Sequence, residues 1–122
     1  MSKIYNEYLR LKQKDFNKIY LIKNGNFYIF LDEDAKVMSE ELGLKLSKFN
    51  NKINKCGFPI TELNKYLKFI KLLKFDYEII YLGYDFIIND ILNLDLNHLD
   101  EKEVKEKLKY YQKLLGDIRN GK

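Results

Sequence analysis

The feature that most constrains the fold is a pair of short β-rich runs on either side of the dipeptide Asn24-Gly25. Residues 19–23 (IYLIK) and 26–30 (NFYIF) consist largely of β-branched and aromatic side chains, the types enriched in strands. Asn and Gly both tolerate the positive φ that the two central residues of a type I′ turn require. The sequence therefore predicts a β-hairpin that turns at Asn24-Gly25, and a sheet to which this hairpin belongs.

Helical and extended patterns alternate along the rest of the chain. The expected helices are 2–14 with Ser2 as its cap, 32–42 with Gly43 as its stop, one from Thr61 to about residue 73, and a last one from about Asp100. Strands are expected over 44–47 and over 77–81, and the second should be buried or central because it is nearly all apolar. A turn is expected over 57–59, whereas 86–96 fits a helix or a strand. This order predicts an α/β fold of the α+β type, a mixed β-sheet flanked by helices, in a single domain over residues 1–122.

Charge is distributed unevenly along the 122 residues. Residues 1–75 hold 15 Lys and Arg against 8 Asp and Glu, whereas residues 76–122 hold 7 against 10, which together give the net charge of +4. A basic front section favours an anionic partner such as nucleic acid. Lysine together with abundant Asn and Ile is also typical of low-GC coding bias, which raises lysine without any partner. Both interpretations stay open.

Residues that carry catalytic or cofactor chemistry are scarce. No GxxxxGK[ST] loop is present, and one histidine, His98, with one cysteine, Cys56, cannot supply the usual ligands of a zinc site. The acidic cluster at 32–34 can hold a cation, but its place at a helix start explains it more simply through the helix dipole. No apolar run approaches the roughly 20 residues of a membrane span. We therefore expect no enzyme activity, no metal, no cofactor and no membrane contact, in a cytoplasmic protein.

Four sequence blocks, in order, carry a resemblance to a known family. They are YLRLK at 8–12, GNFYIF at 25–30 followed by Asp34-Ala35, ELGLKLSK at 41–48, and CGFP at 56–59 followed by Tyr66-Leu67. They resemble the motifs YLxLK, GDFYE-F…DA, LGLxLTK and CGFP…YL of the N-terminal mismatch-recognition domain, domain I, of the MutS family of DNA mismatch repair proteins. The resemblance covers residues 5–82. Residues 83–122 then form a divergent C-terminal extension that ends in a helix.

The resemblance implies a role for Phe27. In the family, the Phe of a Phe-x-Glu motif enters the minor groove at a kink and stacks on the mispaired base, and the Glu bonds to the same base. Position 29 should stand beside Phe27, because residues two apart in a strand share a face. It is Ile29, whose side chain cannot form the hydrogen bond of the family Glu. Phe27 and Ile29 either wedge a base step without reading it or fill the core.

Lysines lie between the third and fourth blocks, where the family approaches the DNA backbone. This lysine-rich segment consists of Lys45, Lys48, Lys52 and Lys55. The resemblance implies that the segment contacts phosphates, chiefly through Lys48, Lys52 and Lys55, and such contacts position a protein without reading sequence. A solvated loop is the alternative. Two further positions depart from the family pattern: Asn26 replaces its Asp, and Ile60-Thr61 replaces the His that follows CGFP.

Two functions are expected from these observations. The first is a stand-alone DNA-binding homologue, linked to mismatch repair, that binds mismatched or distorted double-stranded DNA through the Phe27 wedge and lysine–phosphate contacts. It would lie at the nucleoid and lack the clamp and ATPase domains of the family. The alternative is a protein–protein interaction module that keeps the domain I fold but has lost mismatch recognition. Its partner would bind the face of Phe27 and Ile29 or the C-terminal helix.

Overall fold

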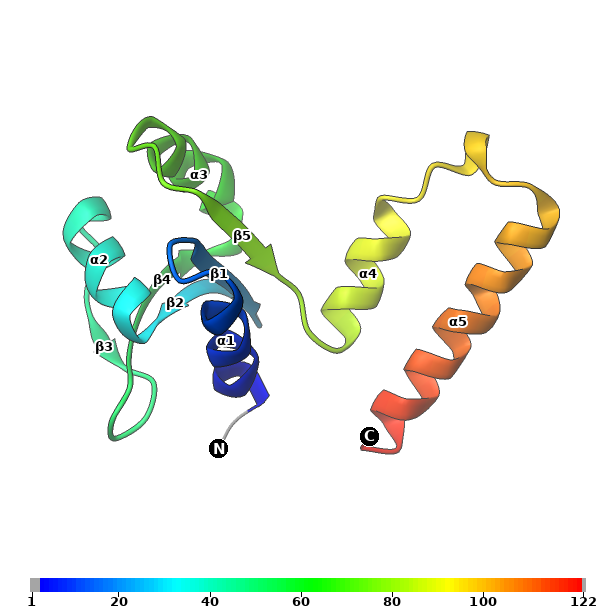
Figure 1. Ribbon diagram of the computed structural model, residues 1–122, viewed down its shortest axis with the longest axis horizontal. Helices are drawn as coiled ribbons and strands as arrows, with labels where there is room; N and C mark the ends of the chain where they lie inside the picture. The colour runs from blue at the N-terminus through cyan, green and yellow to red at the C-terminus, as the bar shows by residue number, and fades with distance from the viewer. Residues whose placement is uncertain (1–2, 122) are drawn as a thin grey trace. The chain divides into compact units, whose positions relative to one another are not determined.

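Residues 19–80 contain a mixed five-stranded sheet in a computed structural model that describes residues 3–121 (Figure 1). The strands, in the order β3-β4-β2-β1-β5, are β1 (Ile19–Asn24), β2 (Phe27–Leu31), β3 (Ser47–Lys48), β4 (Asn54–Pro59) and β5 (Tyr77–Ile80). Strand β5 runs parallel to β1, and the other neighbouring strands are antiparallel. The predicted mixed sheet flanked by helices is confirmed. Strand β5 is an edge strand and only Ile80 of its four residues is buried, so the prediction of a buried or central strand is wrong.

Contacts along the chain define two compact units, Met1–Ile80 and Tyr81–Lys122. The first unit contains the sheet with α1 (Lys3–Lys14), α2 (Asp32–Leu42), the short 3₁₀ helix η1 (Ile60–Glu62) and α3 (Leu63–Leu72). The second contains α4 (Tyr84–Leu92), η2 (Leu96–His98) and α5 (Glu101–Arg119). The predicted family-like segment, 5–82, ends close to the division. A single domain over residues 1–122 stays a prediction.

The predicted hairpin is present, but its turn lies one residue further along. Asn24 pairs with Phe27, so the two loop residues are Gly25 and Asn26. Among the described residues, Gly25 has a positive φ of 62° and Asn26 does not. A positive φ at the first loop position alone fits a type II′ turn, which takes glycine there. The type I′ turn predicted at Asn24-Gly25 is therefore wrong, and Phe27 is the first residue of β2.

Strand β4 occupies the segment where a turn was predicted. Gly57 lies opposite Ile29 in the antiparallel pair, and a Cβ on Gly57 would lie 2.3 Å from the carbonyl oxygen of Tyr28. Glycine therefore serves here to let two strands approach closely rather than to bend the chain. Pro59 ends the strand, where the missing amide costs little.

Several element boundaries differ from the predicted ones. The strand expected over 44–47 is reduced to β3, and Thr61 lies inside η1 rather than capping α3. The ambiguous segment 86–96 is helical as far as Leu92, where α4 ends. The ends of α1 and α2 are confirmed, with Gly43 at φ 70° after α2. The predicted start of the last helix at about Asp100 is also confirmed, and the Asp100 carboxylate caps this helix by accepting a 2.8 Å hydrogen bond from the Glu103 amide. The predicted cap Ser2 lies outside the described residues.

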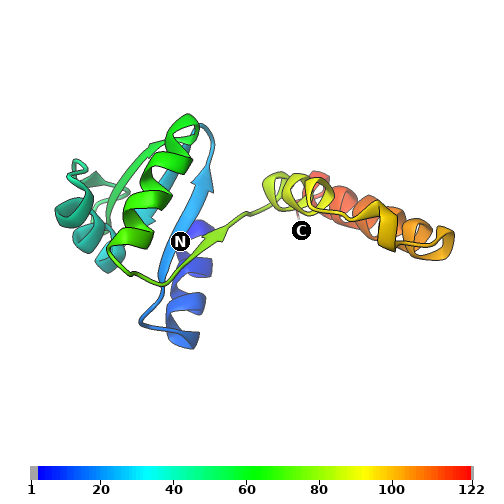
Figure 2. The same ribbon diagram turned by 90° about the horizontal axis from the view of Figure 1, so that it is seen from above.

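The two faces of the sheet are covered by different helices (Figure 2). On one face, Phe58 of β4 stacks on Tyr66 of α3, with ring centroids 4.4 Å apart, and Phe30 packs beside them. On the other face, Tyr20 donates a 3.1 Å hydrogen bond to the carbonyl oxygen of Leu11 in α1. Ile29 of β2 lies opposite Ile22 of β1. Because residues two apart in a strand share a face, Ile22 and Tyr20 lie on the same face, and Ile29 lies there too.

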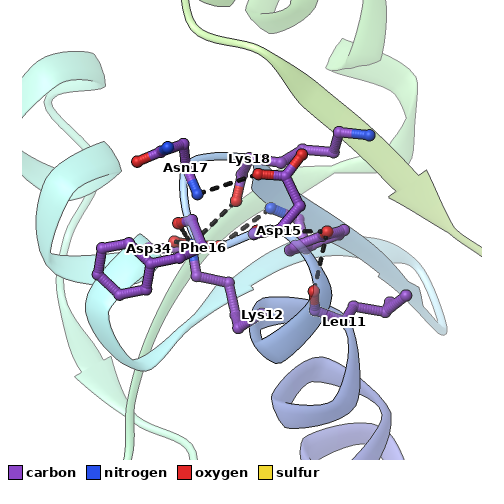
Figure 3. Close-up of polar contacts among 8 residues, drawn as sticks. Leu11, Lys12, Asp15, Phe16, Asn17, Lys18 and Asp34 are labelled. Atoms are coloured by element: carbon purple, nitrogen blue, oxygen red, sulfur yellow. Dashed lines mark hydrogen bonds and ion pairs between the residues drawn. The ribbon is translucent and has the colours of Figure 1, made fainter.

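An ion pair joins α1 to the start of α2 (Figure 3). Lys12 Nζ donates to Asp34 Oδ1 at 2.9 Å and to the carbonyl oxygens of Phe16 and Lys18 at 2.7 and 2.9 Å. The second carboxylate oxygen of Asp34 accepts a 3.0 Å hydrogen bond from the Tyr20 amide. Asp34 is 1% exposed, so the helix dipole predicted to explain the acidic cluster accounts for only part of its role. Lys12 and Asp34 belong to the first and second sequence blocks, which therefore carry structural constraints.

Candidate nucleic-acid interface

Phe27 stands at the tip of the β1–β2 hairpin with half of its side chain in solvent. Its exposed fraction is 51%, whereas the other four residues of β2 are buried. The position follows from the tight turn at Gly25, which places Phe27 at the strand end. Phe27 therefore does not fill the core, in contrast to Ile29, which is 5% exposed.

A pocket of about 350 Å³ opens beside Phe27, and we call it the Phe27 pocket. It is built by the β1–β2 hairpin, the segment that leads into β3, and β4. Its lining residues are Asn24, Phe27, Ile29, Lys45, Ser47, Lys55, Cys56 and Gly57. Phe27 and Ile29 both line the pocket, as expected for residues two apart in one strand. The buried Ile29 adds little exposed apolar surface of the kind that the interaction-module hypothesis invokes.

The predicted lysines divide between two places. Lys55 lines the Phe27 pocket, together with Lys45. Lys48 is exposed on β3 and pairs in the sheet with Asn54, and Lys52 lines a separate pocket that includes Tyr5. The structure therefore brings one of the three predicted lysines to Phe27 and leaves the other two elsewhere on the same unit.

Sequence reasoning placed Lys45 in the lysine-rich segment expected near the DNA backbone, but it did not single out Ser47. A signal for Ser47 existed in Leu44-Lys45-Leu46-Ser47, whose alternation puts Lys45 and Ser47 on one side and the leucines on the other. Asn24 and Gly57 also line the pocket. They were noted only for the turns expected at their positions, and Gly57 reaches the pocket because its segment is a strand.

The electrostatic character of the pocket is positive. Within residues 3–121, no Asp or Glu lines the pocket, and neither Lys45 nor Lys55 forms an ion pair. Residues 42–61 contain four lysines and no acidic residue. An aromatic ring, an apolar floor and two ammonium groups without neutralising carboxylates suit an anionic ligand that carries a flat ring system.

The cysteine and the histidine show no catalytic arrangement. Cys56 is 3% exposed and its thiol donates a 3.3 Å hydrogen bond to the Ala35 carbonyl oxygen. Burial raises the pKa of the Cys56 thiol to about 12, so the thiolate that would act as a nucleophile is scarce at neutral pH. His98 is exposed in η2 and pairs with Asp95. Over residues 3–121, no cluster of three or more His, Cys, Asp or Glu residues could hold a metal ion.

The helices give no sign of a membrane span. In the part of the chain that the structure describes, none is both long enough and apolar enough to cross a bilayer.

Comparison with known proteins places the pocket inside a recognised family region. Residues 2–83 match the family model MutS domain I. The chain is 33% identical over 79 residues to the DNA mismatch repair protein MutS of Thermotoga petrophila, which covers 65% of this chain and 10% of that protein. The chain is 35% identical over 79 residues to the MutS protein of Petrotoga mobilis, which covers 65% of this chain and 9% of that protein. It is 34% identical over 65 residues to the MutS protein of Fusobacterium nucleatum, which covers 50% of this chain and 7% of that protein. The chain thus spans a tenth or less of the length of these relatives.

Proposed function

The chain belongs, over residues 2–83, to the MutS domain I family, and on this basis we propose that it binds double-stranded DNA at a mismatch or other distortion by inserting Phe27 into the base stack. Its role would be linked to DNA mismatch repair, as the names of its relatives indicate. ATP hydrolysis is not part of the proposed activity of this segment. Binding to chromosomal DNA would place it in the cytoplasm at the nucleoid.

The exposure of Phe27 carries this proposal. Full burial of an apolar side chain contributes about 1.5–3 kcal/mol to stability. Phe27 is 51% exposed at the tip of a hairpin, so it gains only part of that free energy within this protein. Stacking on a nucleobase supplies an apolar partner for the ring, at about 1–3 kcal/mol per base. A mismatched or distorted step is cheaper to unstack than a paired one, so the same wedge favours distorted duplex.

Lysines around the wedge support a nucleic-acid partner over an apolar protein surface. Residues 1–80, the first unit, hold 15 Lys and Arg against 10 Asp and Glu. Lys45 and Lys55 line the Phe27 pocket, and Lys48 and Lys52 extend the basic segment along the chain. Contacts of this kind hold phosphates and steer DNA to the protein without reading its sequence.

Ile29 sets the expected specificity. An isoleucine side chain neither donates nor accepts a hydrogen bond, so position 29 cannot read the identity of a base. We expect the protein to distinguish distorted from regular duplex through the cost of unstacking, with weak preference among different mispairs.

The test is fluorescence anisotropy with labelled DNA at low salt, comparing matched duplex, the same duplex with one mismatch, and single strand. We expect the mismatched duplex to bind more tightly than the matched one, and Phe27→Ala to reduce its affinity by roughly 5- to 150-fold, the equivalent of one lost base stack. Phe16→Ala is the matched control, because Phe16 is 75% exposed and precedes β1, at the other end of that strand from Phe27. Equal effects of the two substitutions, or unchanged binding by Phe27→Ala, would contradict the wedge.

A protein-interaction module is the second candidate, and one observation favours it. Several large apolar side chains of the second unit are exposed, among them Leu92 of α4 at 77% and Leu108 of α5 at 58%. A partner on the C-terminal helix would cover such side chains, and a partner on the face of Phe27 and Ile29 would cover the half-exposed Phe27 ring. Absence of DNA binding at low salt, together with self-association that Leu108→Glu abolishes, would favour this function over the first.

A further inference from the structure

The second unit is a pair of antiparallel helices joined along a single line of contact (Figure 1). In the described part of this unit, Ile87 of α4 and Tyr111 of α5 are the only buried residues. The Tyr111 hydroxyl donates a hydrogen bond to the Asp90 carboxylate of α4, and Lys107 Nζ lies 3.7 Å from the same carboxylate. These contacts fix which side of each helix faces the other.

Helix α4 carries an exposed apolar stripe beside that contact. Tyr84, Ile88 and Ile91 are 52%, 54% and 46% exposed, and their spacing of four and then three residues places them on one side of the helix. At about 100° per residue, all three are rotated from the inward-facing Ile87 in the same sense, by roughly 40–100°. The stripe therefore borders the line of contact on one side.

Helix α5 carries a matching stripe. Leu108 and Leu115 are 58% and 41% exposed, and they are rotated from the inward-facing Tyr111 by roughly 60° and 40°, in the same sense as the stripe of α4. Because the two helices are antiparallel, the same sense of rotation leads to the same side of the pair. We call this side the hairpin face, and its residues are Tyr84, Ile88, Ile91, Leu108 and Leu115.

The second unit is too small to cover this face by itself. Residues 81–122 lie near the length of about 40 residues below which a folded unit usually needs a disulfide, a metal or oligomerisation. The sequence has one cysteine, Cys56, and it lies in the first unit, so no disulfide can form within residues 81–122. Within residues 3–121 no cluster of His, Cys, Asp or Glu could hold a metal ion. Oligomerisation remains, and a helical hairpin buries such a face in a four-helix bundle.

The charges at the two ends of α5 are complementary to those of a second copy. Glu101 precedes Leu108 by seven residues and Arg119 follows Leu115 by four, so both charges lie on the side of the leucines, one at each end of the helix. Both are exposed, and among the described residues neither forms an ion pair. If two copies of α5 pack antiparallel, two-fold symmetry brings each Glu101 opposite Arg119 of the second copy. A parallel arrangement would instead oppose like charges.

From these features we infer that the chain forms a homodimer in which two copies of the α4–α5 hairpin pack through their hairpin faces as a four-helix bundle, with the two α5 helices antiparallel. Helices α4 and α5 follow the family region, residues 2–83, so the contact lies outside the segment that the family match covers. It does not depend on DNA, and each dimer carries two copies of the first unit.

The first test is the mass of the full chain in solution without DNA, by sedimentation equilibrium over a range of concentrations. We expect twice the 14.7 kDa of one chain, and Leu108→Glu to give the single-chain mass because it places a carboxylate in the apolar contact. Tyr110→Glu is the matched control, since Tyr110 is 44% exposed and lies two residues further along α5, on another side of the helix. A monomer at about 100 μM, well above the micromolar limit of weak specific interfaces, would overturn the inference, whether the first unit or another protein covers the hairpin face. Equal effects of the two substitutions would overturn it as well.

The second test fixes the orientation of the two α5 helices. Glu101→Arg opposes like charges at both ends of the antiparallel pair, and we expect it to raise the dissociation constant of the dimer roughly two- to thirtyfold, the range of two exposed ion pairs. The double variant Glu101→Arg with Arg119→Glu should recover the affinity. Glu103→Arg makes the same change of charge in the first turn of α5 on another side of the helix, and it should leave the dimer unchanged. No weakening by Glu101→Arg, or no recovery in the double variant, would overturn the antiparallel dimer.

The proposed function is tested separately, because both measurements are made without DNA. A monomer that binds distorted duplex would overturn the dimer and leave the proposed function standing. A dimer that the Leu108→Glu variant dissociates, but that binds no DNA at low salt, would support the inference and overturn the proposed function.

Discussion

Lys12 and Asp34 form an ion pair between residues 22 positions apart, with 2.9 Å between Nζ and Oδ1 and side chains only 13% and 2% exposed. The same carboxylate holds the amide of Tyr20 in β1. Three elements, α1, β1 and the first turn of α2, are thus fixed by one buried carboxylate. Because β1 and β2 form the hairpin that ends at Phe27, this network anchors one end of the hairpin while its other end faces the pocket.

Removing Asp34 should strongly destabilise the protein. Breaking a buried ion pair by deleting one partner costs about 3–5 kcal/mol, because the remaining charge is left buried. Lys12 would keep its two backbone acceptors, Phe16 and Lys18, so we expect Asp34→Ala to lower the free energy of unfolding by about 3 kcal/mol, the low end of that range. Urea unfolding followed by circular dichroism measures it.

The exposed pair Lys36–Glu33 supplies the control for that experiment. Its side chains are 53% and 65% exposed, and exposed pairs of this kind contribute about 0.2–1 kcal/mol at most. We therefore expect Glu33→Ala to be nearly neutral. Similar losses for Glu33→Ala and Asp34→Ala would show that the buried network has no special role.

Gly57→Ala should lower stability even though glycine in a strand is ordinarily a poor choice. The added Cβ would meet the Tyr28 carbonyl oxygen at 2.3 Å, so the β2–β4 pair must shift, at a cost of about 1–3 kcal/mol by analogy with overpacked cores. In contrast, Gly116→Ala in α5 meets nothing within 4 Å and should stabilise by about 0.5–1 kcal/mol through helix propensity. Thermal unfolding of the two variants checks the opposite signs, and a stabilising Gly57→Ala would contradict the assigned strand pairing.

Gly57 also illustrates what the sequence could and could not reveal. The hairpin was predictable because two β-rich runs flank a turn-forming dipeptide, yet its turn was misplaced by one residue because cross-strand pairing of Asn24 with Phe27 decides the loop. Local preferences alone predict a turn at Gly57-Phe58-Pro59. Its strand conformation depends on pairing with β2, about 30 residues earlier in the chain.

Long-range contacts explain the remaining differences. The acidic cluster at 32–34 had a sufficient local explanation in the helix dipole, so nothing in the sequence pointed from Asp34 to Lys12. The resemblance indicates Phe27 and the lysine segment. It does not show that Lys55 lines the Phe27 pocket whereas Lys52 lines a different pocket, because the path of the chain between β3 and β4 decides this. Periodicity assigns a face to a residue, whereas loop geometry decides which faces meet.

Alkaline pH should destabilise the first unit through Cys56. Burial raises the pKa of the thiol to about 12 from its ordinary 9.0, so between these values the unfolded chain loses a proton that the native protein keeps. The unfolded state then binds fewer protons, and the free energy of unfolding falls as pH rises through this window. At pH 10.5 we expect this group to account for a loss of about 1–2 kcal/mol relative to pH 8.

Cys56→Ala isolates that contribution. The variant should show a shallower decline of stability between pH 8 and pH 10.5, measured by urea unfolding at each pH. A remaining decline is expected from Tyr8, whose buried hydroxyl also has a raised pKa. An identical pH dependence in the variant and the wild type would mean that Cys56 ionises equally in both states.

Salt dependence should show whether the lysine segment contacts the DNA backbone. Each phosphate that a lysine neutralises adds about 0.9 to the slope of log affinity against log salt concentration on B-DNA. If Lys48, Lys52 and Lys55 all contact phosphates, replacing any one by Gln should reduce that slope by about 1 and weaken matched and distorted duplex alike. Anisotropy titrations at four salt concentrations measure the slopes, and an unchanged slope in all three variants would mean that the lysine segment is solvated and stays off the DNA.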